Sequence, residues 1–131
     1  MAGSSESYHE PIAELSTQTR HVHQALSSLQ EELEAVDWYR QRAEVCSDPE
    51  LKEILLHNMR EEIEHACMVL EWLRRSDQDF AEQMQTYLFT KAPIVEIEEQ
   101  EDSLAPPTDE RSQRVAADPP ARFTIGDLKR K

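Results

Sequence analysis

Two residues of metal-ligand type lie three positions apart near the middle of an expected helix. Glu62 and His65 occupy the stripe of that helix that should be apolar, and Glu32 has a similar place on the preceding helix. One Glu on one helix and Glu-x-x-His on the next make half the ligand set of a di-iron carboxylate centre in a four-helix bundle. The chain has no further helix to supply the other half. The pattern therefore predicts a metal site that a second copy of the same chain completes.

A carboxylate on a packing stripe needs a partner, because burying it ionised and unpaired costs several kcal/mol. The neighbours of Glu62 on its face are Asn58, His65 and Ala66, so no Lys or Arg supplies a cation there. Across a dimer axis four carboxylates would crowd together, and a divalent metal would relieve their repulsion. Carboxylate and imidazole without thiolate favour iron or manganese over structural zinc, and a glutamate-bridged iron pair suits oxidation of Fe(II) by oxygen. The alternative is an ordinary hydrogen bond between Glu62 and His65, which leaves Glu32 unexplained.

Two other helix faces carry ligand-type residues at a spacing of three and four. Either face is an accessory cation site or simply a solvated charged surface, and spacing alone does not decide between them. Tyr39 lies two turns beyond Glu32 on the same line, where it either belongs to the core or lies near the metal and hydrogen-bonds a ligand. The two faces consist of Glu31, Glu34 and Trp38 on the first helix, and of His57, Glu61 and Glu64 on the second.

The elements that position these residues are two long helices joined by a short turn. Apolar residues step by three and four from about Pro11 to Cys46, as in helices that pack against each other. Asp48 before Pro49 is typical of a helix start, and the second helix runs to about Arg75. The short connection predicts an antiparallel hairpin, followed by a short third helix that Pro93 ends. The predicted class is all-α, with no strand.

The length, net charge and amino-acid composition of the chain exclude several kinds of function. The chain has 131 residues and a formal net charge of -13, which argues against nucleic-acid binding. No apolar stretch is long enough to span a membrane and none resembles a signal peptide, so we expect a cytoplasmic protein. Two cysteines without a CxxC motif fit a reducing compartment, and two glycines leave no phosphate-binding loop. Two helices cannot enclose a core alone, which favours oligomerisation.

Three parts are expected along the chain. Residues 1–95 form the helical hairpin domain, and residues 96–121 form an acidic, disordered linker with Pro106-Pro107. Residues 122–131 are basic and carry three large apolar side chains that a solvated tail does not need: Phe123, Ile125 and Leu128.

Several stretches of the sequence resemble the encapsulated ferritins over about residues 8–95. The stretches are Glu31-Glu-Leu-Glu-Ala-Val-Asp-Trp-Tyr39, Glu61-Glu-Ile-Glu-His65, Leu70-Glu-Trp-Leu-Arg-Arg75 and Thr86-Tyr-Leu-Phe-Thr90. The resemblance implies a protomer that pairs with another into a ferritin-like four-helix bundle, with the pairs arranged in a ring. It implies a ferroxidase centre at the pair interface that binds two irons through Glu32, Glu62 and His65 of both chains, with Tyr39 nearby. It also implies that iron enters at Glu31 and Glu34 beside Trp38, and that an outer site lies on His57, Glu61 and Glu64.

The C-terminal residues resemble the peptide that loads cargo into encapsulin nanocompartments. Phe123, Ile125 and Leu128 would fill pockets on the inner wall of the shell, and Gly126 would permit a close turn of the backbone. The implied function is oxidation of Fe(II) for mineralisation and storage inside the shell. The alternatives are a non-catalytic helical adaptor that brings other cargo to a shell, and a di-iron oxygenase or peroxidase acting on another substrate.

Overall fold

The computed structural model describes residues 8–104, and these residues form helices without any strand. A short 3-10 helix, η1, covers Ile12–Glu14, and two long helices follow, α1 over Thr17–Val45 and α2 over Pro49–Ser76. Two shorter helices complete this part of the chain, α3 over Gln78–Tyr87 and α4 over Ile94–Leu104. The all-α class and the long hairpin are thus confirmed. Contacts divide the chain into two units between Ser76 and Asp77, and each unit is described by itself.

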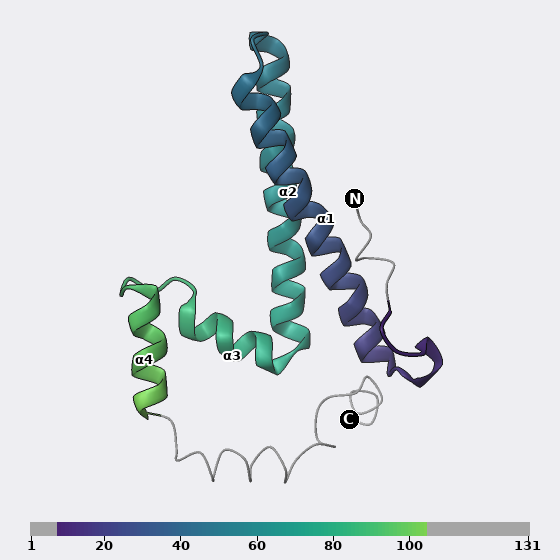
Figure 1. Ribbon diagram of the computed structural model, residues 1–131, viewed down its shortest axis with the longest axis vertical. Coiled ribbons are helices and arrows are strands. Elements are labelled where there is room, and N and C mark those ends of the chain that lie inside the picture. The colour runs from purple at the N-terminus through teal and green to yellow at the C-terminus, as the bar shows by residue number, and fades with distance from the viewer. Residues whose placement is uncertain (1–7, 105–131) are drawn as a thin grey trace. The chain divides into compact units, whose positions relative to one another are not determined.

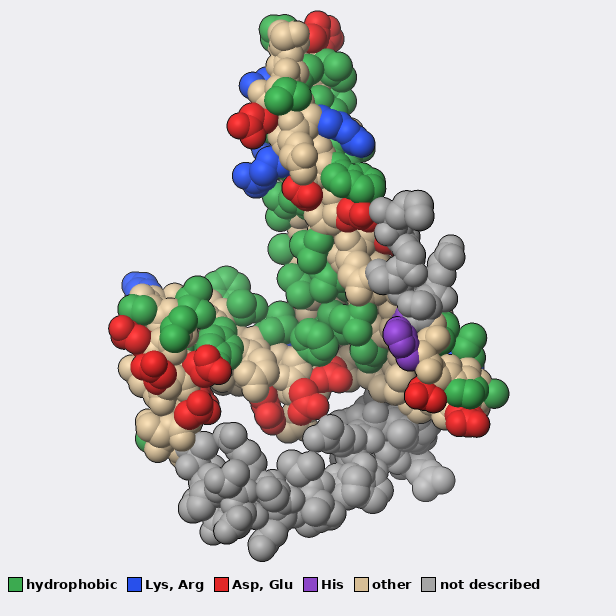
Figure 2. All heavy atoms as spheres, viewed as in Figure 1, with side chains coloured by type: hydrophobic (Ala, Val, Ile, Leu, Met, Phe, Trp, Pro, Cys, Tyr) green, Lys and Arg blue, Asp and Glu red, His purple; other side chains and the backbone are tan. Residues whose placement is uncertain are grey.

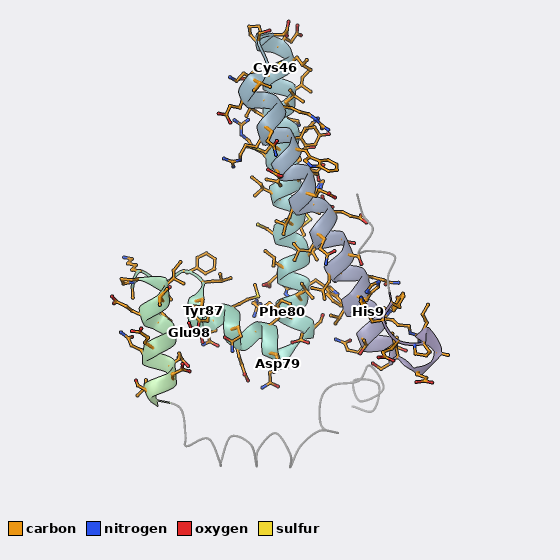
Figure 3. All side chains as sticks on the ribbon, viewed as in Figure 1. His9, Cys46, Asp79, Phe80, Tyr87 and Glu98 are labelled. Carbon is orange, nitrogen blue, oxygen red and sulfur yellow. The ribbon has the colours of Figure 1, made fainter. Side chains whose placement is uncertain are left out.

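Helices α1 and α2 form an antiparallel hairpin in the first unit (Figure 1). Asp48 caps α2 as predicted, because its Oδ1 accepts a hydrogen bond from the Leu51 amide at 2.8 Å and Pro49 is the first helical residue. Cys46 lies at the turn that joins the two helices (Figure 3). At the other end, the Gln18 side-chain amide donates to the Ser76 carbonyl at 2.9 Å and ties the start of α1 to the end of α2.

The first long helix begins later than the sequence predicts. The expected start was Pro11, but α1 starts at Thr17. Ser16 is the cap, since its hydroxyl accepts a hydrogen bond from the Thr19 amide at 3.1 Å. Leu15 has an extended backbone, so the helical run is interrupted before the cap.

A single hairpin encloses very little core. The buried apolar residues of the hairpin are Ala43, Ala66 and Leu73, while Leu33 and Leu51 of the predicted apolar stripes remain exposed. Figure 2 shows hydrophobic side chains reaching the surface along the hairpin among charged ones. Exposed apolar side chains in such number are typical of a surface that another chain covers.

The second unit contains α3 and α4. Asp77 caps α3, with its Oδ1 accepting a hydrogen bond from the Phe80 amide at 3.0 Å. The helix ends at Tyr87, before the predicted stop at Pro93, and Phe89 follows with a positive φ of 61°. Figure 3 labels Phe80 and Tyr87 on α3 and Glu98 on α4.

The start of the predicted linker is helical. Residues 96–104 belong to α4, so the expected disorder from residue 96 was wrong for this stretch. Two features favour a helix there: the Pro93 carbonyl accepts the first intrahelical hydrogen bond, from the Ile97 amide at 3.3 Å, and Glu96 lies in the first turn, where its charge suits the helix dipole. Ile97 is buried, which gives the helix an apolar anchor. The rest of the linker and the C-terminal segment, with Phe123, Ile125, Gly126 and Leu128, lie outside the described residues.

Candidate metal centre

Three side chains from the two long helices converge at one point of the hairpin. Glu32 comes from α1, while Glu62 and His65 come from α2, one turn apart on the same face. One ligand atom from each residue lies within 4.8 Å of the other two. Within residues 8–104 this is the one group of three or more carboxylate, imidazole or thiol side chains that lie this close. The structure therefore brings together the three residues predicted for the metal site.

The imidazole of His65 presents its Nδ1 atom to both carboxylates. Nδ1 lies 3.3 Å from Glu62 Oε2 and 3.7 Å from Glu32 Oε2. A cation about 2.1 Å from each ligand would place neighbouring octahedral ligand atoms about 3 Å apart. Small side-chain movements therefore suffice to bring these atoms around one ion.

The site is partly shielded from water. The side chains of Glu32 and Glu62 are 26% and 23% exposed, and that of His65 is 48% exposed. No Lys or Arg forms an ion pair with either carboxylate among the ion pairs of the described residues. Within residues 8–104, His65 is then the only side chain that can carry a positive charge and pairs with the two carboxylates.

The pKa values of the two carboxyl groups shift in opposite directions. A hydrogen bond to Glu62 raises the pKa of Glu32, and burial adds to this rise. The same hydrogen bond lowers the pKa of Glu62, and the His65 imidazole lowers it further. The hydrogen bond to Glu62 in turn raises the pKa of His65, with help from the charge of Glu32. Without a cation, Glu32 and His65 therefore keep their protons to a higher pH than usual, and a metal ion would have to displace any that remain.

The donor set fits a hard or borderline divalent cation. It offers carboxylate oxygens and one imidazole nitrogen, whereas neither Cys46 nor Cys67 belongs to the group. Such ligands suit iron or manganese better than a closed zinc site, which usually includes thiolates. Three donor residues also leave an octahedral ion open, so water or further side chains must complete its shell.

The other predicted site residues lie apart from this group. Tyr39 is half-buried on α1, with the Arg42 guanidinium 5.5 Å from the centre of its ring. Trp38 lines a shallow recess of about 280 Å³ with Gln41 and Arg42. Glu31 on the same helix is exposed and Glu34 is half-buried.

The predicted outer face is only partly assembled in one chain. His57 Nε2 lies 3.0 Å from Glu61 Oε1, one turn apart on α2. Glu64 is exposed and does not join them in a group of three ligands within residues 8–104. A cation held there would need ligands from water or from another molecule.

The sequence analysis did not single out a groove between the start of α1 and the end of α2. Its volume is about 510 Å³. Val69 and Trp72 in its wall continue the stripe of Glu62 and His65 on α2. This continuation of the stripe is the feature of the sequence that could have indicated the groove. The wall consists of His21, Gln24, Ala25, Ser28, Met68, Val69 and Trp72.

A helical hairpin with a carboxylate–histidine group on its packing stripe has the arrangement of half a ferritin-like four-helix bundle. A model of the EncFtn-like family matches residues 7–91. The chain is 57% identical to an encapsulated ferritin-like protein from Rhodospirillum rubrum over 75% of its own length and 70% of that protein. It is 52% identical to a ferritin-like protein from Thermotoga maritima over 72% of its own length and 83% of that protein.

Solved structures agree with the sequence comparisons. The crystal structure of protein ne0167 from Nitrosomonas europaea matches with a TM-score of 0.65 at 56% identity, covering 68% of this chain and 98% of that one. The chain therefore belongs to the EncFtn-like family of encapsulated ferritin-like proteins. Within the described residues, none of the helices combines the length and apolar character needed to cross a membrane.

Proposed function

We propose that the protein is a ferroxidase whose substrate, Fe(II), binds to Glu32, Glu62 and His65 at the interface of two copies. The observation that carries this proposal is the convergence of the three side chains on a packing stripe with no Lys or Arg paired to the carboxylates in the described part of the chain. Carboxylates on an apolar packing stripe cost free energy on burial unless a cation in the assembly compensates their charge. Membership of a ferritin-like family supports iron as that cation.

A second copy would complete the ligand set and cover the exposed apolar residues of the hairpin. Three donor residues do not fill the coordination shell of iron, and a twofold axis beside the site would add three more. Exposed apolar residues near the site, including Leu33 and Trp72, would be covered by the same contact. Two such protomers make a four-helix bundle with two irons between them, and pairs of this kind would assemble into a ring.

In the proposed reaction, two Fe(II) ions lose one electron each and dioxygen takes up both electrons with two protons, giving two Fe(III) and hydrogen peroxide. The carboxylates stabilise the increased charge of the product ions. His65 fixes the geometry through Nδ1, which faces both acids. Tyr39 would lie near the reacting pair. The faces of Glu31 and Glu34 beside Trp38, and of His57, Glu61 and Glu64, would guide iron toward the centre.

The product would be stored elsewhere, because a ring of hairpins has no closed cavity for mineral. We propose that residues 122–131 dock inside an encapsulin shell through Phe123, Ile125 and Leu128, with Gly126 allowing a close approach. The Rhodospirillum rubrum relative carries the name of an encapsulated protein, which supports this placement. The protein would then work in the cytoplasm inside a nanocompartment, where Fe(III) mineralises.

The proposal is tested by loading the protein with Fe(II) under anaerobic conditions and measuring oxygen consumption once air is admitted. Glu62→Gln and His65→Ala should each slow Fe(II) oxidation at least about tenfold, since even residues that only support metal ligands cost 10–100-fold. Glu53→Gln is the matched control, because Glu53 is an exposed carboxylate on the same helix. Full oxidation rates in both site variants would overturn the assignment. A wild-type chain that binds no iron would instead indicate a non-catalytic adaptor.

A further inference from the structure

Helix α4 presents a face of one apolar and three acidic residues that has no described partner. Val95, Glu98, Glu99 and Asp102 follow a spacing of three and four, which places them together on one side of the helix. The buried Ile97 lies about 200° around the helix from Val95, on the opposite side. We call these four residues the acidic face of α4, and Figure 2 shows acidic side chains gathered over this helix.

The acidic face is exposed and uncompensated. All four residues are exposed, and Val95 is 69% exposed although it is apolar. The sequence Ile94–Leu104 contains no Lys or Arg, and no ion pair within residues 8–104 includes a carboxylate of α4. Glu98 and Asp102 repel each other at a spacing of four, and Asp102 lies near the negative end of the helix dipole. A basic ligand with an apolar side chain would relieve both effects and cover Val95.

The chain contains a segment with this chemistry. Residues 122–131 carry Arg122, Lys129, Arg130 and Lys131 around three large apolar side chains. We propose that this basic C-terminal segment docks on the acidic face of α4 of its own chain. The contact would hold the segment on the protein until a stronger receptor competes for it. Neither iron oxidation nor a shell is needed for this contact, so it stands apart from the proposed function.

Length and charge favour the chain's own segment over a separate molecule. Residues 105–121 connect α4 to the segment, and a stretch of that length spans at most about 60 Å when fully extended. Helix α4 is about 16 Å long, so the segment can reach every position on it. A covalent connection of this length also gives an effective concentration of about a millimolar, which populates a weak contact without help from a second molecule.

Selective labelling of glycine with ¹⁵N in the full-length protein gives a direct test. The chain has two glycines, Gly3 and Gly126, so one amide signal reports on the segment and the other is an internal reference. We expect the Gly126 signal to be weak at ~0.01 M salt and to gain about twofold in intensity relative to Gly3 at ~1 M, where the Debye length falls from ~30 Å to ~3 Å. The twofold gain corresponds to a segment that is about half docked at low salt.

Variants of the acidic face decide whether α4 is the receptor. Glu98→Lys with Asp102→Lys should give the high-salt Gly126 signal already at low salt, and Glu98→Gln with Asp102→Asn should give a smaller change in the same direction. The control is Glu44→Lys with Glu53→Lys, which changes the net charge equally on exposed positions of the hairpin. An unchanged Gly126 signal in the α4 variants, or an equal change in the control, would overturn the proposal. A signal that depends on protein concentration would assign the contact to another copy and would also overturn it.

Discussion

Replacing Glu62 by glutamine removes one negative charge from the candidate metal site and keeps the shape of the side chain. We expect the effect of this substitution on stability to have opposite signs with and without metal. Without metal, the substitution relieves repulsion between Glu62 and Glu32, so the free energy of unfolding should rise. With metal, the same substitution removes a ligand, so the variant should be less stable than the wild type.

The magnitude without metal follows from the geometry of the site. Two unit charges within 4.8 Å repel by about 3.5 kcal/mol at an effective dielectric constant of about 20, and by about 0.9 kcal/mol in water. Because about a quarter of each side chain is exposed, the expected gain at neutral pH is about 1–2 kcal/mol. The glutamine oxygen can still accept a hydrogen bond from His65, so that contact is not lost.

The magnitude with metal follows from mass action. An ion present at about 100 times its Kd stabilises the wild type by about 2.7 kcal/mol, and Glu62→Gln should lose most of this. Denaturant unfolding at a fixed protein concentration, with and without Mn(II) as an ion that is not oxidised by air, measures both effects. Glu53→Gln should change neither value, since Glu53 is exposed on the same helix. A Glu62→Gln variant that Mn(II) stabilises as much as the wild type would refute the reasoning.

Three further outcomes are expected. Glu71 is held by Arg74 and Arg75 at 2.7 and 2.9 Å, and these hydrogen bonds lower its pKa to about 2. Its contribution to stability is present above pH 4.5 and is lost as pH falls toward 2, so Glu71→Gln should weaken the acid dependence of helix content measured by circular dichroism. The hydrogen bond that His65 donates to Glu62 raises the pKa of His65. This proton must leave before Nδ1 binds metal, so calorimetry should find Mn(II) affinity increasing as pH rises through that pKa. Native mass spectrometry should find more paired chains with Mn(II) than without, and equal pairing would contradict a role for metal in assembly.

The sequence predicted the cluster of Glu32, Glu62 and His65 because these polar residues occupy positions that are normally apolar. Charged residues at positions where helices pack are costly, so Glu32, Glu62 and His65 stand out against an apolar stripe. The cap at Asp48 was equally visible, because a cap depends only on the few residues next to it. Local chemistry of this kind carries over from sequence to structure without knowledge of the tertiary fold.

The features that the sequence analysis missed depend on competition between local and distant contacts. The acidic composition of residues 96–104 favoured disorder, yet α4 forms there with a buried Ile97 and a first helical hydrogen bond to the Pro93 carbonyl. The apolar spacing before Thr17 suited a helix, but the cap at Ser16 set the start. Spacing also cannot place Glu64 relative to His57 and Glu61, because long side chains on one face have several rotamers.

In the proposed pair of hairpins, the cluster of Glu32, Glu62 and His65 would also determine the register in which the helices pack. An apolar stripe with a spacing of three and four can pack against another stripe in several registers, because one turn resembles the next. A polar position within such a stripe removes this freedom, since only one register gives the polar residues their partners. Here Glu32 and Glu62 would meet their symmetry mates in one register and face apolar residues in the others. The cation proposed as substrate would thus also select the pairing that forms its own site.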